Sequence, residues 1–264
     1  MASTIGLTGL LSSSDGAGTI LEDLIDTATS PYTGTINYTG VVADTSRFAS
    51  SPPKSKTNAI GVGEWTVSAS ARFPGGGADF GDVSDLTYSS LDDFKVSSWT
   101  LNMNWDEFDD TGMAAAGVTW REWVMGALSW TATVQCNIDD TTALPAVGAS
   151  ATATFKINDD TADNTLAGTA LVQNVSGVVS RGARNTATVT LQGTGDLTSA
   201  GTNPLFPAGA LDKSAVTGIV LRAEGDVDYE GEALLRGCTI STGIGQLIDI
   251  GLDIRGTGAL TRGS

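Results

Sequence analysis

The sequence predicts an all-β protein made of two similar domains, and three observations support this prediction. The chain of 264 residues is 41% hydrophobic and only 17% charged, and it contains 33 glycines, a profile typical of strands joined by many turns. Apolar and polar residues alternate in several runs, as they do in strands that bury one face. Two kinds of segment are each repeated, which indicates that one supersecondary unit is built more than once.

The clearest repeat lies near the C-terminus, in residues 168–198 and 231–261. Their closing sequences, QGTGDLT and RGTGALT, are nearly the same. Eight residues recur at a constant offset of 63 without a gap: Gly168, Ala170, Leu171, Gly193, Thr194, Gly195, Leu197 and Thr198. The two segments are therefore predicted to be equivalent strand pairs.

A second repeat precedes the first one. Strand-like runs begin at Ile36 and Trp65, and they begin again at Leu101 and Trp130, at a constant offset of 65. Long connections separate the members of each pair, at 44–63 and 106–126. Connections of this length are usually functional or disordered, so their matching places indicate a shared purpose.

The repeats can be combined into domains in two ways. A nested arrangement places an inserted domain, 90–204, within a discontinuous domain, 1–89 plus 205–264. An interleaved arrangement instead pairs the first with the third unit and the second with the fourth. We favour the nested arrangement because it needs no crossing connections, with linkers at 75–93 and 199–212. Helical spacing of apolar residues also predicts a short helix at 20–25.

Part of the chain resembles the major tail tube proteins of long-tailed bacteriophages. In that family a W-R-E/K-aromatic segment leads into a G-x-x-S-W strand, and the domain closes with a G-E-A strand and a G-T-G-x-L-T strand. The matching residues of the first pattern are Trp120, Arg121, Glu122, Trp123, Gly126, Leu128, Ser129 and Trp130. The second pattern is matched by the repeated glycine segment at 168–198, and the similarity is greatest over 97–198. The first unit departs most, because it lacks W-R-E and carries Pro52-Pro53.

The resemblance implies a β-sandwich or partly closed barrel flanked by one or two short helices. Family rings contain six such domains around a lumen, so a chain with two domains would form a ring of three chains with pseudo-sixfold symmetry. The implied function is that of a virion structural protein, assembled in the host cytoplasm into the phage tail. Its implied partners are copies of itself and the terminator, tape measure and distal tail proteins, with DNA passing only transiently.

Composition excludes several other functions. A formal charge of −16 repels phosphate backbones and anionic lipids, so neither specific DNA binding nor membrane binding is expected. The chain has no histidine, and we expect no enzyme activity, cofactor or metal. Cys136 and Cys238 are far apart in strand-like runs and are expected to be reduced and buried. With no signal peptide or apolar transmembrane run, the protein is expected to be soluble.

Two groups of residues are candidates for assembly contacts. Opposite charges on the two long connections predict complementary ring-to-ring contacts, formed by Lys54, Lys56, Asp106, Glu107, Asp109 and Asp110. The acidic residues could also ligate Ca²⁺, although they lack EF-hand spacing and favour a solvated loop. Trp120 and Trp123 share a face at helical spacing and, with Trp130, are interpreted either as core residues or as anchors at a subunit boundary.

Two other classes of protein remain open on sequence alone. A capsid decoration protein, or another virion protein with a β-sandwich, would share the acidity and lack of histidine. A carbohydrate-binding β-sandwich would need an exposed aromatic platform. Acidic pairs suitable for a glycosidase are inevitable among 30 carboxylates, and the G-T-G segments lack the third glycine of a dinucleotide site, so neither points to catalysis.

Overall fold

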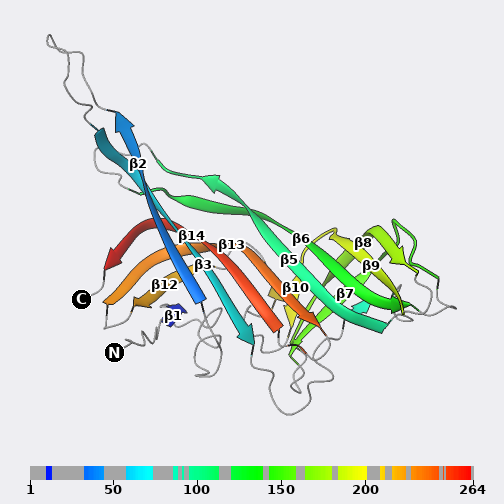
Figure 1. The fold of residues 1–264 in the computed structure, drawn as a ribbon. Coiled ribbons are helices and arrows are strands. Elements are labelled where there is room, and N and C mark those ends of the chain that lie inside the picture. Colours follow the sequence, from blue (N-terminus) through cyan, green and yellow to red (C-terminus); the bar gives the residue numbers. More distant parts are fainter. Residues whose placement is uncertain are drawn as a thin grey trace, which may run out of the picture.

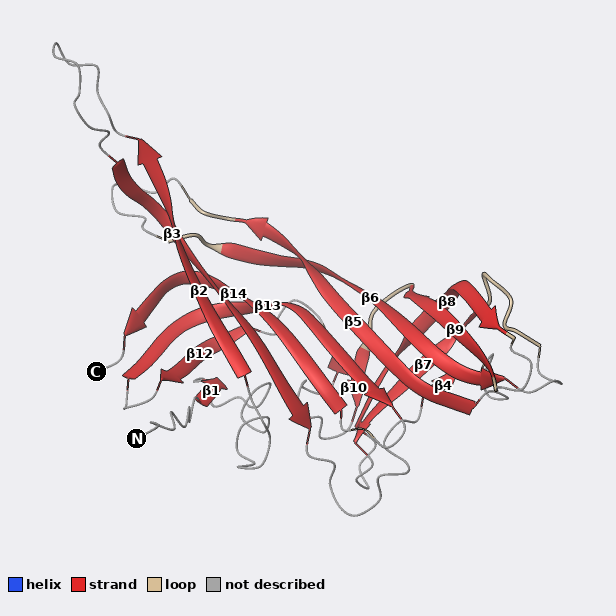
Figure 2. Cartoon of the chain, viewed as in Figure 1, coloured by secondary structure: helices blue, strands red, loops and turns tan. Residues whose placement is uncertain are grey.

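The fold was analysed in a computed structural model. It describes residues 10–13, 33–44, 58–73, 86–88, 91, 95–112, 120–138, 143–158, 164–179, 184–200, 209–211, 216–223, 227–243, 246 and 248–262. Within these ranges every regular element is a β-strand, as Figures 1 and 2 show, so the all-β prediction is confirmed. The helix expected at 20–25 lies outside the described residues.

Fourteen strands are present, and most of them are long. In chain order they are β1 (Leu10–Ser13), β2 (Thr33–Asp44), β3 (Asn58–Phe73), β4 (Leu86–Tyr88), β5 (Lys95–Asp109), β6 (Trp123–Ile138), β7 (Ser150–Asn158), β8 (Asn164–Val178), β9 (Asn185–Gly193), β10 (Thr198–Ala200), β11 (Gly209–Ala210), β12 (Val216–Ala223), β13 (Val227–Gly243) and β14 (Ile248–Arg262).

All fourteen strands belong to one antiparallel sheet. Its main path runs β11-β10-β8-β9-β6-β5-β13-β14-β3-β2. The sheet does not close on itself, so within one chain the described residues form an open sheet and no barrel. The other strands branch from the path, since β12 pairs with β13 and β1, and β7 pairs with β8 and β4. In Figure 1 these branches lie below the main path, which gives the fold a sandwich-like form.

The core follows from strict alternation along the long strands. In β5 the side chains of Trp99, Leu101, Met103 and Trp105 are buried, while the residues between them are not. The same period places four isoleucine and leucine side chains of β14 in the core: Ile248, Ile250, Leu252 and Ile254. Burying a side chain of this size contributes roughly 1.5–3 kcal/mol, so these strands are anchored by one face each.

Strand β7 joins the core through Phe155. Its ring lies 5.2 Å from that of Trp99 and 6.1 Å from that of Trp130, the latter at right angles. Edge-to-face contacts of this kind add to the burial of the rings. The branch strand is thus held on the main path by aromatic packing.

Two expectations about segments between strands are wrong, that of the long connections and that of the linkers. The two long connections are shorter than predicted, because β2 extends to Asp44, β3 begins at Asn58, and β5 and β6 continue to Asp109 and from Trp123. The predicted linkers at 75–93 and 199–212 contain strands β4, β10 and β11. Leu86 and Tyr88 of β4 are buried, and the Tyr88 hydroxyl donates a hydrogen bond to the Ala149 carbonyl at 3.0 Å, so this segment is part of the core.

Candidate assembly surfaces

The face of the main sheet opposite the core carries mostly uncharged polar side chains. We call it the polar face and define it by the residues that alternate with core residues in β3, β5, β6, β9, β13 and β14. Examples are Thr66, Ser68, Ser70, Thr100, Asn102, Asn104, Ser129, Thr131, Thr133, Gln135, Thr188, Thr190, Gln192, Thr239 and Ser241. Such a surface offers hydrogen-bonding groups but little charge. It cannot supply the basic groove that binding to a nucleic acid requires.

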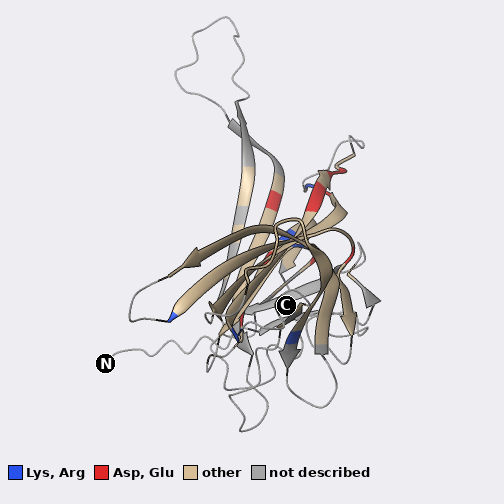
Figure 3. Ribbon diagram, turned by 90° about the vertical axis from the view of Figure 1, so that its right-hand side faces the viewer, with Lys and Arg blue, Asp and Glu red and all other residues tan. Residues whose placement is uncertain are grey.

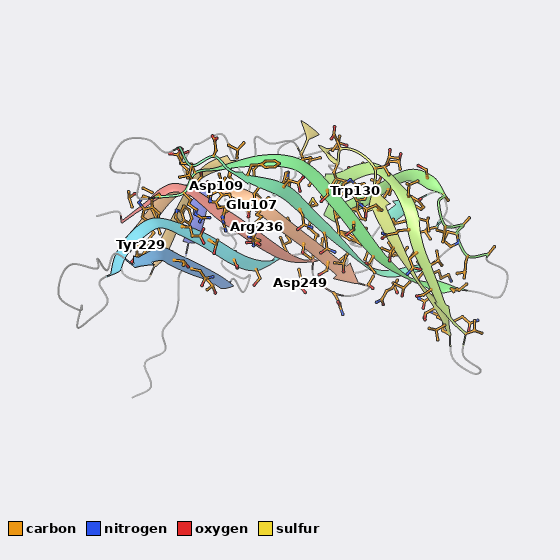
Figure 4. The ribbon with its side chains drawn as sticks, turned by 90° about the horizontal axis from the view of Figure 1, so that it is seen from above. Glu107, Asp109, Trp130, Tyr229, Arg236 and Asp249 are labelled. Atoms are coloured by element: carbon orange, nitrogen blue, oxygen red, sulfur yellow. The ribbon has the colours of Figure 1, made fainter. Side chains whose placement is uncertain are left out.

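Most charged side chains on this face gather at one place, on β13 and β14 and the nearby end of β5. The Arg236 Nε donates a hydrogen bond to Asp253 Oδ2 at 2.9 Å, and its guanidinium lies 3.8 Å from Glu107. Hydrogen bonding to Asp253 raises the pKa of Arg236 above its ordinary value. Figure 4 shows Glu107, Asp109 and Arg236 together, with Asp249 apart from them.

A second arginine links this cluster to an aromatic ring. Arg255, whose side chain is only 12% exposed, lies 3.4 Å from Glu64 and 3.8 Å from Glu107. Its guanidinium also stacks on Trp123 at 3.9 Å from the ring centroid. Stacking and ion pairing together suit the planar guanidinium better than an ammonium group. Arg255 thus ties strand β14 to both β5 and β6.

The start of β6 is bound to β3 and β14 by hydrogen bonds of its backbone. The Arg121 amide donates to the Gly63 carbonyl at 3.0 Å, and the Gly258 amide donates to the Arg121 carbonyl at 2.8 Å. The Trp123 amide donates to Thr257 Oγ1 at 3.0 Å. The end of the β5–β6 hairpin, which we call the second arm, therefore rests on β3 and β14. The β2–β3 hairpin forms the corresponding first arm, and both project to the same side of the sheet (Figures 1 and 3).

Trp65 and Trp130 have matching surroundings, in which the indole ring lies on glycines of the repeat. We call these two places the tryptophan seats. Trp130 Nε1 donates to the Gly195 carbonyl at 3.0 Å, and Trp65 Nε1 donates to the Gly258 carbonyl at 3.2 Å. A Cβ atom at Gly168 would lie 2.8 Å from Trp130 Cζ2, and one at Gly231 would lie 2.6 Å from Trp65 Cζ2. The repeated glycines of the sequence are thus the places where an indole ring lies directly on the backbone.

Several strand pairings and register shifts recur at the offsets of 63 and 65. Ala170 pairs with Gly193 in β8–β9, as Ala233 pairs with Gly256 in β13–β14. In β5–β6 the register shifts between Trp105 and Glu107, and in β2–β3 it shifts between Gly40 and Val42, again at the offset of 65. The β8–β9 register shifts between Val172 and Asn174, and the β13–β14 register between Leu235 and Gly237, again at the offset of 63.

One strand pair joins the two halves, and we call it the seam. Residues 237–243 of β13 pair antiparallel with residues 98–104 of β5, from Gly237 opposite Asn104 to Gly243 opposite Ser98. On the polar face Thr239 Oγ1 donates to Asn102 Oδ1 at 3.0 Å. The seam is thus a regular continuation of the sheet.

Two strands of the main path, β2 and β8, have an edge without a strand partner among the described residues. Strand β2 pairs only with β3, on one side. On the side away from β9, strand β8 pairs with β7 up to Leu171, and Val172 bonds to the backbone of Gly148 and Ala149. From Gln173 to Val178 this side of β8 has no strand partner among the described residues. We call these the β2 edge and the β8 edge. Open edges invite pairing with another chain.

Exposed apolar side chains lie at the β8 edge and on the second arm. Val178 is 60% exposed and Val179 81%, and the Leu144 side chain lies beside the edge, within 3.5 Å of the place where a Cβ of Gly177 would be. On the second arm Phe108 and Val124 are 60% and 47% exposed and lie opposite each other in β5–β6. Neighbouring exposed apolar side chains make these two places candidates for contact with another chain.

The residues predicted for ring stacking lie in different surroundings. Lys54 and Lys56 lie outside the described residues. Glu107 contacts Arg236 and Arg255, and Asp109 lies 3.7 Å from Arg121, so these two acids take part in ion pairs within the chain. Hydrogen bonds from Thr111 lower the pKa of Asp109 below its ordinary value. Asp106 and Asp110 are exposed on the second arm.

The expectation of an acidic loop at 106–110 is wrong, because Asp106, Glu107 and Asp109 belong to strand β5. Among the described residues no group of three or more carboxylate or cysteine side chains could hold a metal ion.

The three predicted tryptophans have different surroundings. Trp130 is buried in the core, whereas Trp120 and Trp123 are half-buried and pack against it. The helical spacing proposed for Trp120 and Trp123 is wrong, because Trp120 forms an isolated bridge with Gly63 and Trp123 begins strand β6. The physical reason is that the segment finds backbone partners on β3 and β14 and needs no internal helical hydrogen bonds.

Sequence reasoning missed Arg236, Arg255 and the seats of Trp65 and Trp130. The tryptophan seats could have been found by combining the offsets of 65 and 63, which relate Trp65 to Trp130 and Gly256 to Gly193. No comparable signal exists for Arg255, because its counterpart in the repeat is Gln192.

Comparisons with known proteins leave the chain without an assigned family. No family model matches it, and no curated protein matches its sequence. None of the described residues form a helix that is long and apolar enough to cross a membrane.

Proposed function

We propose that this chain is the major subunit of a phage tail tube, and that three copies form one ring of the tube. The proposal includes an internal duplication, in which β2, β3, β12, β13 and β14 correspond to β5, β6, β7, β8 and β9. Each half is then one tube-type domain, and the division is the nested one, with the second half inserted into the first. The tryptophan seats and the matched register shifts support this correspondence.

The observation that carries the proposal is the pair of open edges. Within the chain, β5 of one half joins β13 of the other. The open edges belong to β2 and β8, which are the counterparts of these two strands. A second chain can therefore repeat the seam, and repetition of a head-to-tail contact generates a ring when the rotation closes. Six halves related by about 60° each close such a ring with three chains.

The polar face suits the wall of a lumen through which DNA passes. Its serine, threonine, asparagine and glutamine side chains carry no charge, and its arginines at 236 and 255 are paired with acids. DNA binds proteins mainly through ion pairs with phosphate, so a wall whose cations are paired allows passage without retention. A mostly neutral wall gives phosphate as little to bind as an acidic wall would.

The two arms suit contacts between stacked rings. Both project to the same side of the sheet, and acidic residues lie along them (Figure 3). The second arm exposes Phe108 and Val124 together with Asp106 and Asp110. In the proposed tube this arm reaches the body of the next ring, and the expected pairing of its acidic residues with Lys54 and Lys56 stays a prediction. The end rings would meet the terminator, tape measure and distal tail proteins.

Negative-stain electron microscopy and mass photometry of the purified protein test the proposal. We expect hollow rings, or tubes of stacked rings, with a ring mass of three chains of 26.9 kDa, about 81 kDa. Rings of six chains would contradict the proposal that each chain supplies two ring positions. A protein that stays monomeric at concentrations of tens of micromolar, or that binds capsid shells or glycans without forming rings, would contradict the proposed function.

A further inference from the structure

We propose that neighbouring copies join by antiparallel pairing of the β8 edge with the β2 edge in one defined register. In this register Asn174 lies opposite Thr39, Ser176 opposite Asn37, and Val178 opposite Thr35 of the neighbouring copy. The inference rests on the proposed ring and specifies the partner of each edge residue. Its occupant is a second copy of this chain.

The seam supplies the template for this register. There Gly237 lies opposite Asn104, Thr239 opposite Asn102, and Ser241 opposite Thr100. Subtracting 63 from the β13 positions and 65 from the β5 positions converts these pairs into the proposed ones. Both offsets hold wherever β2–β3 can be compared with β5–β6 and β8–β9 with β13–β14.

A matched irregularity shows that the β8 edge is shaped like the edge that forms the seam. Strand β13 leaves β12 after Leu234 and shifts its register against β14 between Leu235 and Gly237, immediately before it pairs with β5. Strand β8 leaves β7 after Leu171 and shifts between Val172 and Asn174, immediately before its open edge. A bulge turns a strand and changes which residues face each side, so it sets up the edge beyond it.

The two faces of the sheet agree with the proposed register. On β2, Thr35, Asn37 and Thr39 are exposed. They stand opposite Val178, Ser176 and Asn174, which are the counterparts of the polar-face residues of β13. A slip by one residue would set these three polar residues of β2 opposite the counterparts of core residues.

Burial in the seam explains the exposed valine at the β8 edge. Val179 is 81% exposed, whereas Thr242, its counterpart beside β5, is 5% exposed. Gly177 is exposed, and its counterpart Ile240 is fully buried. Strand β5 lies beside Ile240 and Thr242, whereas no described strand lies beside Gly177 and Val179 on the corresponding edge. A copy of β2 at the β8 edge would supply that strand and would bury Val179.

Disulfide trapping in the assembled full-length protein tests the register. The variant Ser176→Cys/Asn37→Cys places thiols at the counterparts of Thr239 and Asn102, whose side chains touch at 3.0 Å in the seam. The matched control Ser176→Cys/Thr39→Cys moves one thiol two residues along the same face, to a diagonal distance of roughly 7–8 Å. The native cysteines do not interfere, because both are buried and burial raises the pKa of Cys136 to about 11.

We expect mild oxidation of the first variant to give covalent dimers and trimers on non-reducing gels, at least tenfold more than the control. Mixing the single variants Ser176→Cys and Asn37→Cys should give only mixed dimers, as a head-to-tail contact requires. Stronger cross-linking in the control, or dimers of Asn37→Cys alone, would overturn the register. If the unmodified protein still forms rings in that case, the proposed function stays intact. Absence of rings in the unmodified protein would instead overturn the proposed function.

A second measurement covers variants that fail to fold. Hydrogen exchange of the unmodified protein should slow on assembly at residues 33–39 and 174–179, with little change at residues 98–104, which are already paired. Unchanged exchange at 33–39 in assembled rings would overturn the register.

Discussion

Glycines at the two tryptophan seats act by having no side chain. Gly193 lies against Trp130, and Gly256 lies against Trp65, both in direct contact with the indole ring. Their neighbours Gly195 and Gly258 accept the indole hydrogen bonds. The recurrence of G-T-G in the sequence is thus explained by packing, and no bound nucleotide needs to be invoked.

Replacing one of these glycines by alanine should destabilise the protein. In Gly193→Ala and in Gly256→Ala the new methyl group would overlap an indole ring that the core holds in place, and overpacking of this kind costs about 1–3 kcal/mol. Denaturant unfolding of each variant measures the loss. Gly195→Ala is the matched control, because a Cβ there meets nothing within 4 Å, and it should change stability by less than about 0.5 kcal/mol. Equal stability of Gly193→Ala and Gly195→Ala would contradict the role assigned to the seats.

Arginine 255 shows why a residue and its counterpart in the repeat need not do the same work. It contacts Glu64, Glu107 and Trp123 within the chain. Its counterpart Gln192 bonds to the carbonyl of Trp130. The ionic cluster therefore lies beside the seam inside the chain, and the residues that correspond to Arg236 and Arg255 in β8 and β9 are the uncharged Gln173 and Gln192.

At the scale of strands, the sequence was informative wherever one face of a strand is buried. Alternation from Trp65 and from Trp130 predicted parts of β3 and β6, and the glycine repeat predicted that β8–β9 and β13–β14 are alike in kind. Prediction from sequence failed where charged residues extend a strand, as at Glu107. The partners of Glu107, Arg236 and Arg255, are more than a hundred residues away in the chain. Prediction also failed at Trp123, since spacing of three residues does not distinguish a helix from a strand that begins there.

The β8 edge and the second arm should have separable roles, which two matched substitutions can test. Val179→Lys adds a charge where the edge is proposed to bury its side chain, so we expect at least tenfold fewer rings at equal protein concentration. Val124→Lys changes an exposed valine of the second arm, so rings should persist while tubes become shorter. Mass photometry counts rings and electron microscopy measures tube length. Both side chains are exposed in the single chain, at 81% and 47%, so unfolding free energies should stay within about 0.5 kcal/mol of the parent.

The reverse outcome, loss of rings in Val124→Lys and normal rings in Val179→Lys, would exchange the roles of the two surfaces. A loss of stability in either variant of more than about 0.5 kcal/mol would show that its side chain supports the fold of the single chain.

For the whole molecule, the proposed contact between chains differs in charge from the seam inside the chain. The charged residues Glu107, Arg236, Asp253 and Arg255, which lie beside the seam, correspond to the uncharged residues Val42, Gln173, Thr190 and Gln192 of β2, β8 and β9. The proposed pairing between chains would thus rely on backbone hydrogen bonds and apolar contact. Each chain also carries a formal charge of −16, so copies that approach one another repel.

Salt should therefore promote assembly. Raising the ionic strength from about 0.01 M to about 0.1 M shortens the Debye length from about 30 Å to about 10 Å, which screens the repulsion between whole chains. Residues 33–39 and 174–179, which would pair across the contact, are uncharged, so salt has no ion pair to weaken there. We expect the fraction of chains in rings to rise several-fold over this range, measured by mass photometry at constant protein concentration. The Val179→Lys variant, kept monomeric, serves as the control, because its unfolding free energy reports how salt affects the fold alone. A fall in ring formation with salt, while that unfolding free energy stays constant, would mean that ion pairs hold the chains together and that the contact does not follow from the neutral edges.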